Sequence, residues 1–338
     1  MINKLYDEIK KTIKENYKMI ICFIGILLLF TIEFPYYIEA PGGIIDVDER
    51  IEIENVKEKK GSFNLAYVSE IKATIPTLVY AWINKDWDVI EKEEVVYENE
   101  SMEDADYRSH LLLNEANNNA IIVAYTKAGK EITISNEHLY IIYIDEGADT
   151  NLKIGDEILE INGIKIINKE QLDEIMLTKN FNEILNIKVK RNDKEIMCYG
   201  KVRNIDNKKV IGLVLSKTSD IDTNPDIQLN FKSSESGPSG GLIMALSIYN
   251  SLISGDITNG LKIVGTGTID LNGKVGSIGG VEYKIKGAIK EKADIFLVPN
   301  GDNYETAKKV IEENNSDLKL IPVNSFDEAL EKLKSKKV

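Results

Sequence analysis

The residues best placed for chemistry begin with Ser239, which lies in the glycine-framed segment Ser236-Gly237-Pro238-Ser239-Gly240-Gly241. This segment leads into apolar residues spaced for one face of a helix, namely Leu242, Leu246, Tyr249 and Ile253. A helix start presents unpaired backbone N–H groups and the positive end of the helix dipole, and such donors stabilise an oxyanion. The pattern therefore indicates a serine nucleophile. The alternative is a serine that only caps a core helix.

A second glycine-rich segment supplies a candidate base, because Gly279-Gly280 precedes Lys284 in the first turns of a helix predicted over residues 281–293. A lysine removes a proton only when it is neutral, and its ordinary pKa is about 10.4. Burial or the positive field of a helix start must therefore lower the pKa of Lys284 before it can act as a general base. The alternative is an ordinary solvated lysine, as expected for Lys286, Lys290 and Lys292 on the same helix.

Other catalytic arrangements are disfavoured by the residues available. Neither of the two histidines, His110 and His138, lies near a glycine-framed serine or cysteine, so we expect both on the surface. No His-Glu-x-x-His pattern or paired cysteine spacing predicts a zinc site, and we expect no metal and no other cofactor. Residues 267–274 resemble a phosphate-binding loop, but the glycine spacing is one residue too long and Val275 replaces the required Ser or Thr.

Length and charge narrow the class of protein. A chain of 338 residues exceeds what one hydrophobic core usually supports, so two soluble domains with accessory segments are expected. The net charge of -13 repels phosphate backbones, which argues against nucleic acid as a partner. The two cysteines, Cys22 and Cys198, exclude a disulfide scaffold, because the first lies inside the longest apolar run.

The N-terminal region predicts a membrane anchor. Residues 19–32 are apolar apart from Gly and Thr, and further apolar and aromatic residues extend the stretch to residue 38, near the ~20 residues that cross a bilayer. Lysines outnumber acidic residues over 1–18, which predicts a cytoplasmic N-terminus, a single-pass anchor at 19–38 and an extracytoplasmic remainder at the cell membrane. A cleaved signal peptide and a buried core helix are the alternatives.

Residues 39–126, an expected extracytoplasmic segment, show weak periodicity. Pro41-Gly42-Gly43 predicts a rigid break in the chain. Short strands are predicted at 65–75 and 77–82, and an acidic stretch leads into a helix that extends through Asn119.

Residues 127–205 follow a different pattern, in which short aliphatic strands alternate with tight turns. Strands are predicted at 139–144, 157–161 and 185–191, and a helix at about 169–176. Within residues 152–163 the signature Leu-x-x-Gly-Asp-x-Ile-x-x-x-Asn-Gly places glycine and asparagine where turns need positive φ angles. This signature resembles a PDZ domain, which implies a mostly β fold that adds an extended peptide to its sheet. Residues 136–139 stand where the carboxylate-binding loop is expected, and they are polar and bulky.

Residues 206–338 alternate strands and helices, which predicts an α/β fold. Strands are expected at 262–266, 295–299 and 318–323, and Ser325-x-x-Glu328 is a capping box that opens a last amphipathic helix through Ala329, Leu330 and Leu333. Three motifs in order, Gly237-Pro238-Ser239-Gly240-Gly241, Gly265-Thr266-Gly267 and Gly279-Gly280-x-x-x-Lys284, resemble the proteolytic domain of Lon peptidases.

With the anchor and the PDZ-like segment included, nearly the whole chain resembles the Lon-like, PDZ-containing envelope proteases of Gram-positive bacteria. The resemblance implies an α/β (α+β) Lon-type proteolytic domain, preceded by a mostly β PDZ domain and one N-terminal transmembrane helix. It implies an ATP-independent endopeptidase that cleaves envelope or secreted polypeptides recruited by the PDZ domain. Because Lon-type domains often form rings, it also implies a homo-oligomer.

By the same resemblance Ser239 attacks the scissile carbonyl, Lys284 takes its proton and later protonates the leaving amine, and Thr266 orients the lysine. Pro238, Gly240 and Gly280 support this site. Relatives usually carry alanine where Gly240 stands, so we expect the turn that aims the serine to be looser, by about 1 kcal/mol of helix propensity. The competing hypotheses are a catalytically silent, membrane-tethered PDZ adaptor and a nucleotide-binding regulator built on residues 267–274.

Overall fold

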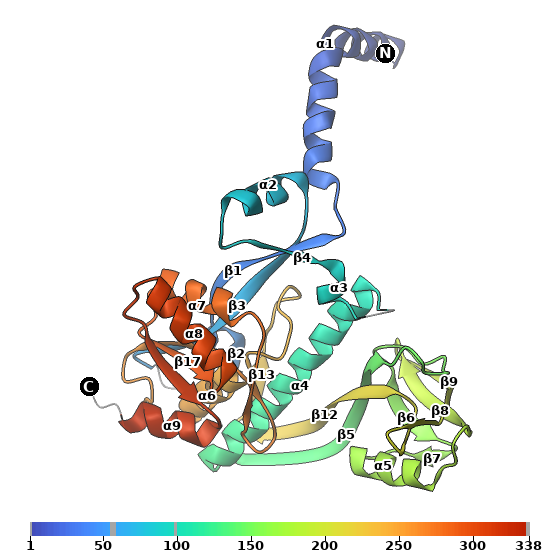
Figure 1. The fold of residues 1–338 in the computed structure, drawn as a ribbon, viewed down its shortest axis with the longest axis vertical. Helices are drawn as coiled ribbons and strands as arrows, with labels where there is room; N and C mark the ends of the chain where they lie inside the picture. The colour runs from blue at the N-terminus through green and yellow to red at the C-terminus, as the bar shows by residue number, and fades with distance from the viewer. Residues whose placement is uncertain (1, 55–58, 98–99, 336–338) are drawn as a thin grey trace. The chain divides into compact units, whose positions relative to one another are not determined.

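The computed structural model describes residues 2–54, 59–97 and 100–335, and the chain divides into two compact units. The first unit comprises Met1–Pro41 and Val68–Val95, and the second comprises Gly42–Tyr67 and Val96–Val338. Figure 1 shows the elements of both units along the chain.

The first unit begins with one long helix, α1 (Ile2–Thr31). Its apolar C-terminal half is exposed, and Met19, Phe23 and Phe30 are 66%, 62% and 62% exposed. Across the residues that the structure describes, no helix combines the length and the apolar content that a membrane crossing requires.

The remainder of the first unit corrects one predicted strand. Residues 77–82 lie in a helix, α2 (Ile75–Ile83), and not in a strand. Thr74 is the N-cap residue, its N–H donates to Thr77 Oγ1 at 2.8 Å, and a proline occupies the first turn. These start signals outweigh the β-propensity of the apolar residues that follow. Two short elements complete the unit, β4 (Asp88–Glu91) and α3 (Lys92–Val95).

A six-stranded sheet carries the predicted α/β architecture, in the order β18-β17-β14-β3-β1-β4. Strand β14 is parallel to both β3 and β17, β17 is parallel to β18, and β4 is antiparallel to β1. The predicted strands near residues 262, 295 and 318 are confirmed, and the strand predicted at 65–75 lies three residues earlier. The bounds are β1 (Tyr36–Asp46), β3 (Ser62–Lys72), β14 (Lys262–Gly265), β17 (Ile295–Pro299) and β18 (Lys319–Val323).

The two faces of this sheet bury two different cores, because successive strand residues point to opposite sides. Ile263 of β14 joins a core built around α6 (Gly241–Leu252) and α9 (Phe326–Ser335). The next residue, Val264, joins a second core with residues of α7 (Val281–Lys290) and α8 (Asp302–Glu313). The amphipathic pattern predicted for the last helix is confirmed, since Ala329, Leu330 and Leu333 are buried.

Pro41-Gly42-Gly43 does not break the chain, because these residues lie inside β1. The two glycines instead permit close packing. A Cβ at Gly42 would lie 2.4 Å from the ring of Tyr67, and a Cβ on Gly287 of α7 would lie 3.3 Å from the backbone N of Gly43. The predicted break is therefore wrong. The segment is a strand, and because its two glycines have no side chains, neighbouring elements can pack closely against it.

The helix predicted through Asn119 is longer than expected and forms α4 (Met102–Ala128). Ser101 caps its N-terminus by accepting from the N–H of Asp104, and Gly129 ends it at φ 63°. Its last turns enter the core around α6, and Tyr125 is fully buried while its hydroxyl donates to Pro225 O at 2.7 Å. Residues on both sides of the PDZ-like segment thus share one core.

The PDZ-like segment forms a sheet in the order β12-β5-β6-β8-β9, with β7 paired to β6. The predicted strands and helix are confirmed, with longer ends. Asn162 and Gly163 form the predicted hairpin turn with φ values of 50° and 79°. The bounds are β5 (Glu131–Ile144), β6 (Glu157–Ile161), β7 (Ile164–Lys165), α5 (Lys169–Thr178), β8 (Ile184–Arg191), β9 (Lys194–Lys201) and β12 (Leu213–Asn224).

Residues 136–139 are not a loop. They belong to β5 and pair with β12, with His138 opposite Thr218 and Leu139 opposite Lys217. The expectation of a carboxylate-binding loop at this position is therefore wrong, because the polar side chains here lie on a paired strand. Shorter elements complete the fold: η1 (Asp48–Arg50), β2 (Ile51–Ile53), β10 (Arg203–Ile205), β11 (Lys208–Val210), β13 (Ile227–Leu229), β15 (Thr268–Ile269) and β16 (Val275–Gly276).

Candidate active site

Ser239 lies at the start of α6, as its sequence context predicts. Gly240 is the N-cap residue, with φ −91° and ψ −7°, and among the described residues at this helix start no side chain caps the backbone. The helix itself is buried along its length. Ser239 therefore precedes the cap position and does not fill the structural role that the capping alternative would give it.

The backbone of Ser239 is held by the loop that follows β14. Its carbonyl accepts hydrogen bonds from Gly267 N at 2.7 Å and from Thr266 Oγ1 at 3.1 Å. In the opposite direction, Leu242 N donates to Gly267 O at 3.0 Å. The structure thus brings two of the predicted residues, Ser239 and Thr266, into direct contact, and it clamps the start of α6 from both sides.

Lys284 lies in the first turn of α7 and is 4% exposed, unlike an ordinary solvated lysine. Gly280 is the N-cap of this helix at φ 63°, a conformation that favours glycine. The Nζ of Lys284 donates to Gly279 O at 3.1 Å. The roles assigned to Lys284 as base and to Thr266 as its orienting residue stay predictions. A hydroxyl that donates its proton to a carbonyl keeps the capacity to accept from a second donor.

The substitution of glycine for alanine at position 240 has a packing counterpart. A Cβ at Gly240 would lie 3.0 and 3.2 Å from Cδ2 and Cδ1 of Leu65 on β3. Leu65 therefore occupies the space beside the turn at Ser239 that an alanine methyl group would need. Pro238 closes the same turn, because its carbonyl accepts from Gly241 N at 3.3 Å.

Two polar contacts that sequence reasoning missed fix the glycine-rich segments. Asn303 of α8 accepts from Ile278 N at 2.9 Å and donates through Nδ2 to Ile278 O at 2.8 Å, which pins the turn that leads to Lys284. Ser109 O of α4 accepts from Gly237 N at 3.0 Å. Neither contact has a local sequence signal, since one joins residues 25 apart and the other uses only backbone atoms.

The side chains of the two histidines are each 31% exposed, and each contacts an acidic residue. His110 is 3.7 Å from Asp106 on the same helix. His138 links three strands, with Nδ1 2.6 Å from Glu157 and Nε2 3.1 Å from Asp220. Among the described residues, no cluster of three or more His, Cys, Asp or Glu side chains could hold a metal ion.

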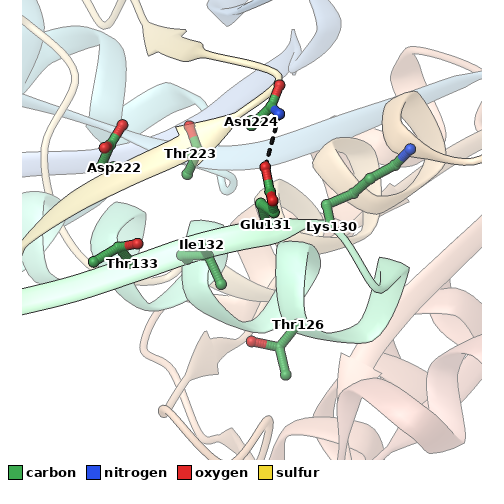
Figure 2. Close-up of a pocket in the computed structure, with 8 residues that line it drawn as sticks. All are labelled: Thr126, Lys130, Glu131, Ile132, Thr133, Asp222, Thr223 and Asn224. Atoms are coloured by element: carbon green, nitrogen blue, oxygen red, sulfur yellow. Dashed lines mark hydrogen bonds between the residues drawn. The ribbon is translucent and has the colours of Figure 1, made fainter.

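A polar pocket of about 610 Å³ lies where α4 ends and where β5 begins beside the end of β12. Figure 2 shows Asn224 reaching Glu131 across it, with Nδ2 2.8 Å from Oε2. Its lining contains none of the predicted site residues, so this pocket is separate from the Ser239 site. The lining residues are Thr126, Lys130, Glu131, Ile132, Thr133, Asp222, Thr223 and Asn224.

Comparison with known families covers the domains just described. Residues 218–335 match the Lon protease (S16) C-terminal proteolytic domain, and residues 111–198 match the PDZ domain family. The chain carries a Lon-type serine peptidase domain and a PDZ domain. Ser239, Thr266 and Lys284 all lie within the residues that match the Lon-type domain.

The similar proteins are longer than the region they share with this chain. Lon protease 2 of Bacillus subtilis is 32% identical over 40% of this chain and 23% of its own length. Lon protease of Xanthomonas oryzae pv. oryzae is 33% identical over 28% of this chain and 11% of its own length. The chain therefore spans about a quarter or less of these relatives.

Solved structures of PDZ domains are similar to part of the chain. The PDZ domain of an SdrC-like protein from Listeria monocytogenes is 23% identical, covers 23% of this chain and 85% of that chain, and has a TM-score of 0.22. The corresponding domain from Listeria innocua is 21% identical, with 23% and 92% coverage and a TM-score of 0.22.

Proposed function

We propose that the chain is an ATP-independent serine endopeptidase in which Ser239 is the nucleophile and Lys284 the general base. The observation that carries the proposal is the pair of hydrogen bonds to the Ser239 carbonyl. These come from Thr266 Oγ1 and Gly267 N, and they fix Ser239 at the start of a buried helix. Lys284 supports it, because burial of a lysine disfavours the ammonium form and so suits the residue to proton abstraction.

In the proposed reaction the Oγ of Ser239 attacks the scissile carbonyl while its proton passes to Lys284 Nζ. The resulting lysine ammonium then protonates the leaving amine, and water hydrolyses the acyl-enzyme. Two N–H groups of the helix start are already bonded, Gly241 N to Pro238 O and Leu242 N to Gly267 O. We therefore assign stabilisation of the oxyanion to the N–H groups of Ser239 and Gly240 and to the helix dipole.

Independence from ATP is supported by the conformation of residues 267–274. A phosphate-binding loop runs from a strand into a helix and cradles phosphate with its N–H groups. Here Thr268–Ile269 pairs with Val275–Gly276 as an antiparallel hairpin. The turn of the hairpin is closed internally, since Gly273 N donates to Asp270 O at 2.9 Å. This geometry suits a structural hairpin better than a nucleotide site.

We further propose that the PDZ domain recruits polypeptide as an added strand on β12. Strand β5 has a partner on each side, β12 and β6, whereas β12 ends the strand order of this sheet among the described residues. The side chain of Asn118 already bonds both Ser219 N at 3.0 Å and Ser219 O at 2.8 Å. The fully buried Ser216 is likewise held by α4, because its Oγ donates to Glu115 at 2.6 Å. The incoming strand would therefore pair with the part of β12 that precedes Ser216, next to the half-buried Leu213 and Leu215.

Attachment to the cell membrane through α1 is part of the same proposal. The exposed apolar side chains of its C-terminal half and the lysines at positions 10, 11, 14 and 18 support a cytoplasmic N-terminus and an extracytoplasmic protease. Cell fractionation with protease accessibility tests this topology. If an added protease does not digest the catalytic domain in intact cells from which the cell wall has been removed, the topology is wrong. Formation of a homo-oligomer stays a prediction.

The decisive experiment measures cleavage of an unfolded polypeptide by the purified full chain without ATP. Ser239→Ala should abolish cleavage, and Lys284→Met should reduce it by about 10²–10⁴-fold, the usual contribution of a general base. Lys290→Met, a substitution of an exposed lysine on the same helix, is the matched control and should retain wild-type activity. Activity should rise toward alkaline pH as the base loses its proton. Wild-type cleavage by Ser239→Ala would reject the mechanism, and failure of a fluorophosphonate probe to label the wild type, with peptide binding intact, would favour the adaptor.

A further inference from the structure

The strongest feature outside the predicted site is a buried ion pair between Arg50, at the end of η1, and Glu235. Arg50 Nε lies 3.1 Å from Glu235 Oε2, and NH2 lies 2.7 Å from Oε1. The two side chains are 10% and 12% exposed. Such a two-point contact fixes the relative orientation of both groups, which a single-point lysine contact would not do.

Backbone contacts reinforce the same connection. Asn230 N donates to Arg50 O at 2.8 Å, and the carboxylate of Glu235 accepts a further bond from Lys232 N at 2.9 Å. Strand β2, which follows Arg50, pairs with β13 (Figure 1). In this pairing Ile51 lies opposite Leu229. Residues 227–235 are therefore held in place by strand pairing, a backbone hydrogen bond and an ion pair with the segment that begins at Arg50.

The ion pair lies close to Ser239 along the chain. Only Ser236, Gly237 and Pro238 separate Glu235 from the serine, and four residues span at most about 14 Å. Gly237 adopts φ 88°, where glycine is favoured, and its N–H is bound to Ser109 O. Because so few residues separate them, we expect a displacement of Glu235 to shift the backbone of Ser239 as well.

The protonation behaviour of the pair agrees with this geometry. Burial alone would raise the pKa of Glu235, but the hydrogen bonds from Arg50 and from Lys232 N–H outweigh it and the net pKa is lowered. The hydrogen bond to Glu235 is also the main reason that the pKa of Arg50 is raised. Both groups are therefore charged at neutral pH, and each needs the other to remain buried.

We propose that Arg50 and Glu235 are a positioning pair that sets the conformation of the loop before Ser239 and thereby the rate of acyl-enzyme formation. The inference rests on the proposed role of Ser239. It differs from a purely structural ion pair, which would change stability without changing the chemical step in the molecules that remain folded.

The PDZ domain offers a matched control. Arg191 contacts Asp156 in the same two-point manner, with Nε 2.6 Å from Oδ1 and NH2 2.6 Å from Oδ2. Its carboxylate partner is fully buried, Arg191 ends β8 and Asp156 directly precedes β6, so the pair belongs to the PDZ domain. Arg191→Lys therefore removes the same geometry at similar burial without touching the loop before Ser239.

The test compares Arg50→Lys, Glu235→Gln and Arg191→Lys in the full chain. For each variant we would measure the thermal midpoint, kcat and KM on a short fluorogenic peptide, and the rate of fluorophosphonate labelling. Arg50→Lys and Glu235→Gln should lower kcat and labelling by about tenfold or more with KM unchanged, equivalent to about 1.4 kcal/mol or more. Arg191→Lys should leave both rates at the wild-type value.

The outcomes separate this inference from the proposed function. Wild-type labelling and kcat in folded Arg50→Lys, while Ser239→Ala is inactive, would overturn the positioning role and leave the protease intact. Cleavage that survives in Ser239→Ala would instead overturn the proposed function. If either single variant, Arg50→Lys or Glu235→Gln, does not fold, the double variant Arg50→Met/Glu235→Met can be tested instead, because it removes both charges at once. Slow labelling of the folded double variant supports the inference, and wild-type labelling rejects it.

Discussion

The hydroxyl of Thr266 provides the sharpest single test of the site, because Thr266→Val removes it at nearly constant shape. Thr266 is fully buried, and its Oγ1 donates to Ser239 O at 3.1 Å. That carbonyl keeps its second and shorter bond from Gly267 N at 2.7 Å, so the substitution leaves no unsatisfied buried acceptor. The expected loss of unfolding free energy is therefore that of one hydrogen bond, about 0.5–1.5 kcal/mol.

The effect on chemistry should be of about the same size in free energy as the effect on folding. If the whole hydrogen-bond energy is used to position Ser239, about 1.4 kcal/mol corresponds to a tenfold slower reaction. We expect fluorophosphonate labelling of Thr266→Val to slow by about tenfold, and by more if Thr266 also orients Lys284 as proposed. Denaturant unfolding and the labelling time course measure the two quantities on the same sample.

Thr258→Val is the control for this prediction. Thr258 is 1% exposed, and its Oγ1 donates to Asp256 at 2.6 Å, in a segment without predicted site residues. It should lose at least as much stability as Thr266→Val but label at the wild-type rate. Equal labelling of wild type and Thr266→Val would show that the bond to Ser239 has no role in aiming the serine. A stability loss above about 3 kcal/mol would show that the carbonyl is not sufficiently held by Gly267.

Two further predictions concern packing and pH. Gly240→Ala requires Leu65 to shift by a few tenths of an ångström, which the flexible end of its side chain permits. We expect the unfolding free energy to change by less than about 1 kcal/mol and activity to be retained. A larger loss of stability in denaturant unfolding would contradict this prediction. Burial lowers the pKa of His138, but its hydrogen bonds to Glu157 and Asp220 outweigh burial, so the net pKa is raised. The contribution of protonated His138 to the stability of the folded state should thus be complete below the unfolded pKa of about 6.5 and be lost as pH rises through the folded pKa. The amide exchange rates of β5 and β12 in wild type and His138→Gln should therefore differ most at acid pH. A difference that grows with pH would refute the assignment.

Much of the local structure was predictable because its causes are local. The turn at Asn162-Gly163 needs two positive φ angles, which that dipeptide tolerates at low cost, and the structure shows both. Apolar spacing located α6 and the last helix, because a helix that packs on a core must present one continuous apolar face. The glycine-framed serine and lysine were recognised for the same reason, since short motifs carry their own backbone requirements.

Errors arose where two local signals competed or where packing reversed the meaning of a residue. At 77–82 the capping contact between Thr74 and Thr77 favoured a helix over a strand. At Gly42 and Gly43 the same glycines that suggest a break allow Tyr67 and α7 to approach β1. Hydropathy and turn rules do not register such approaches, because the partner residues are distant in sequence.

The amino-acid sequence by itself determined most of the strands and helices and the short motifs that hold the candidate residues, since these follow from side-chain spacing within a few turns of chain. Its resemblance to known families indicated the two domain types. Only the tertiary structure decided which distant groups hold them. Thr266 bonds the carbonyl of Ser239, and Arg50 holds Glu235 across 185 positions of sequence. Such partners are selected by burial, where a polar group removed from water must find a matching one wherever the fold brings it.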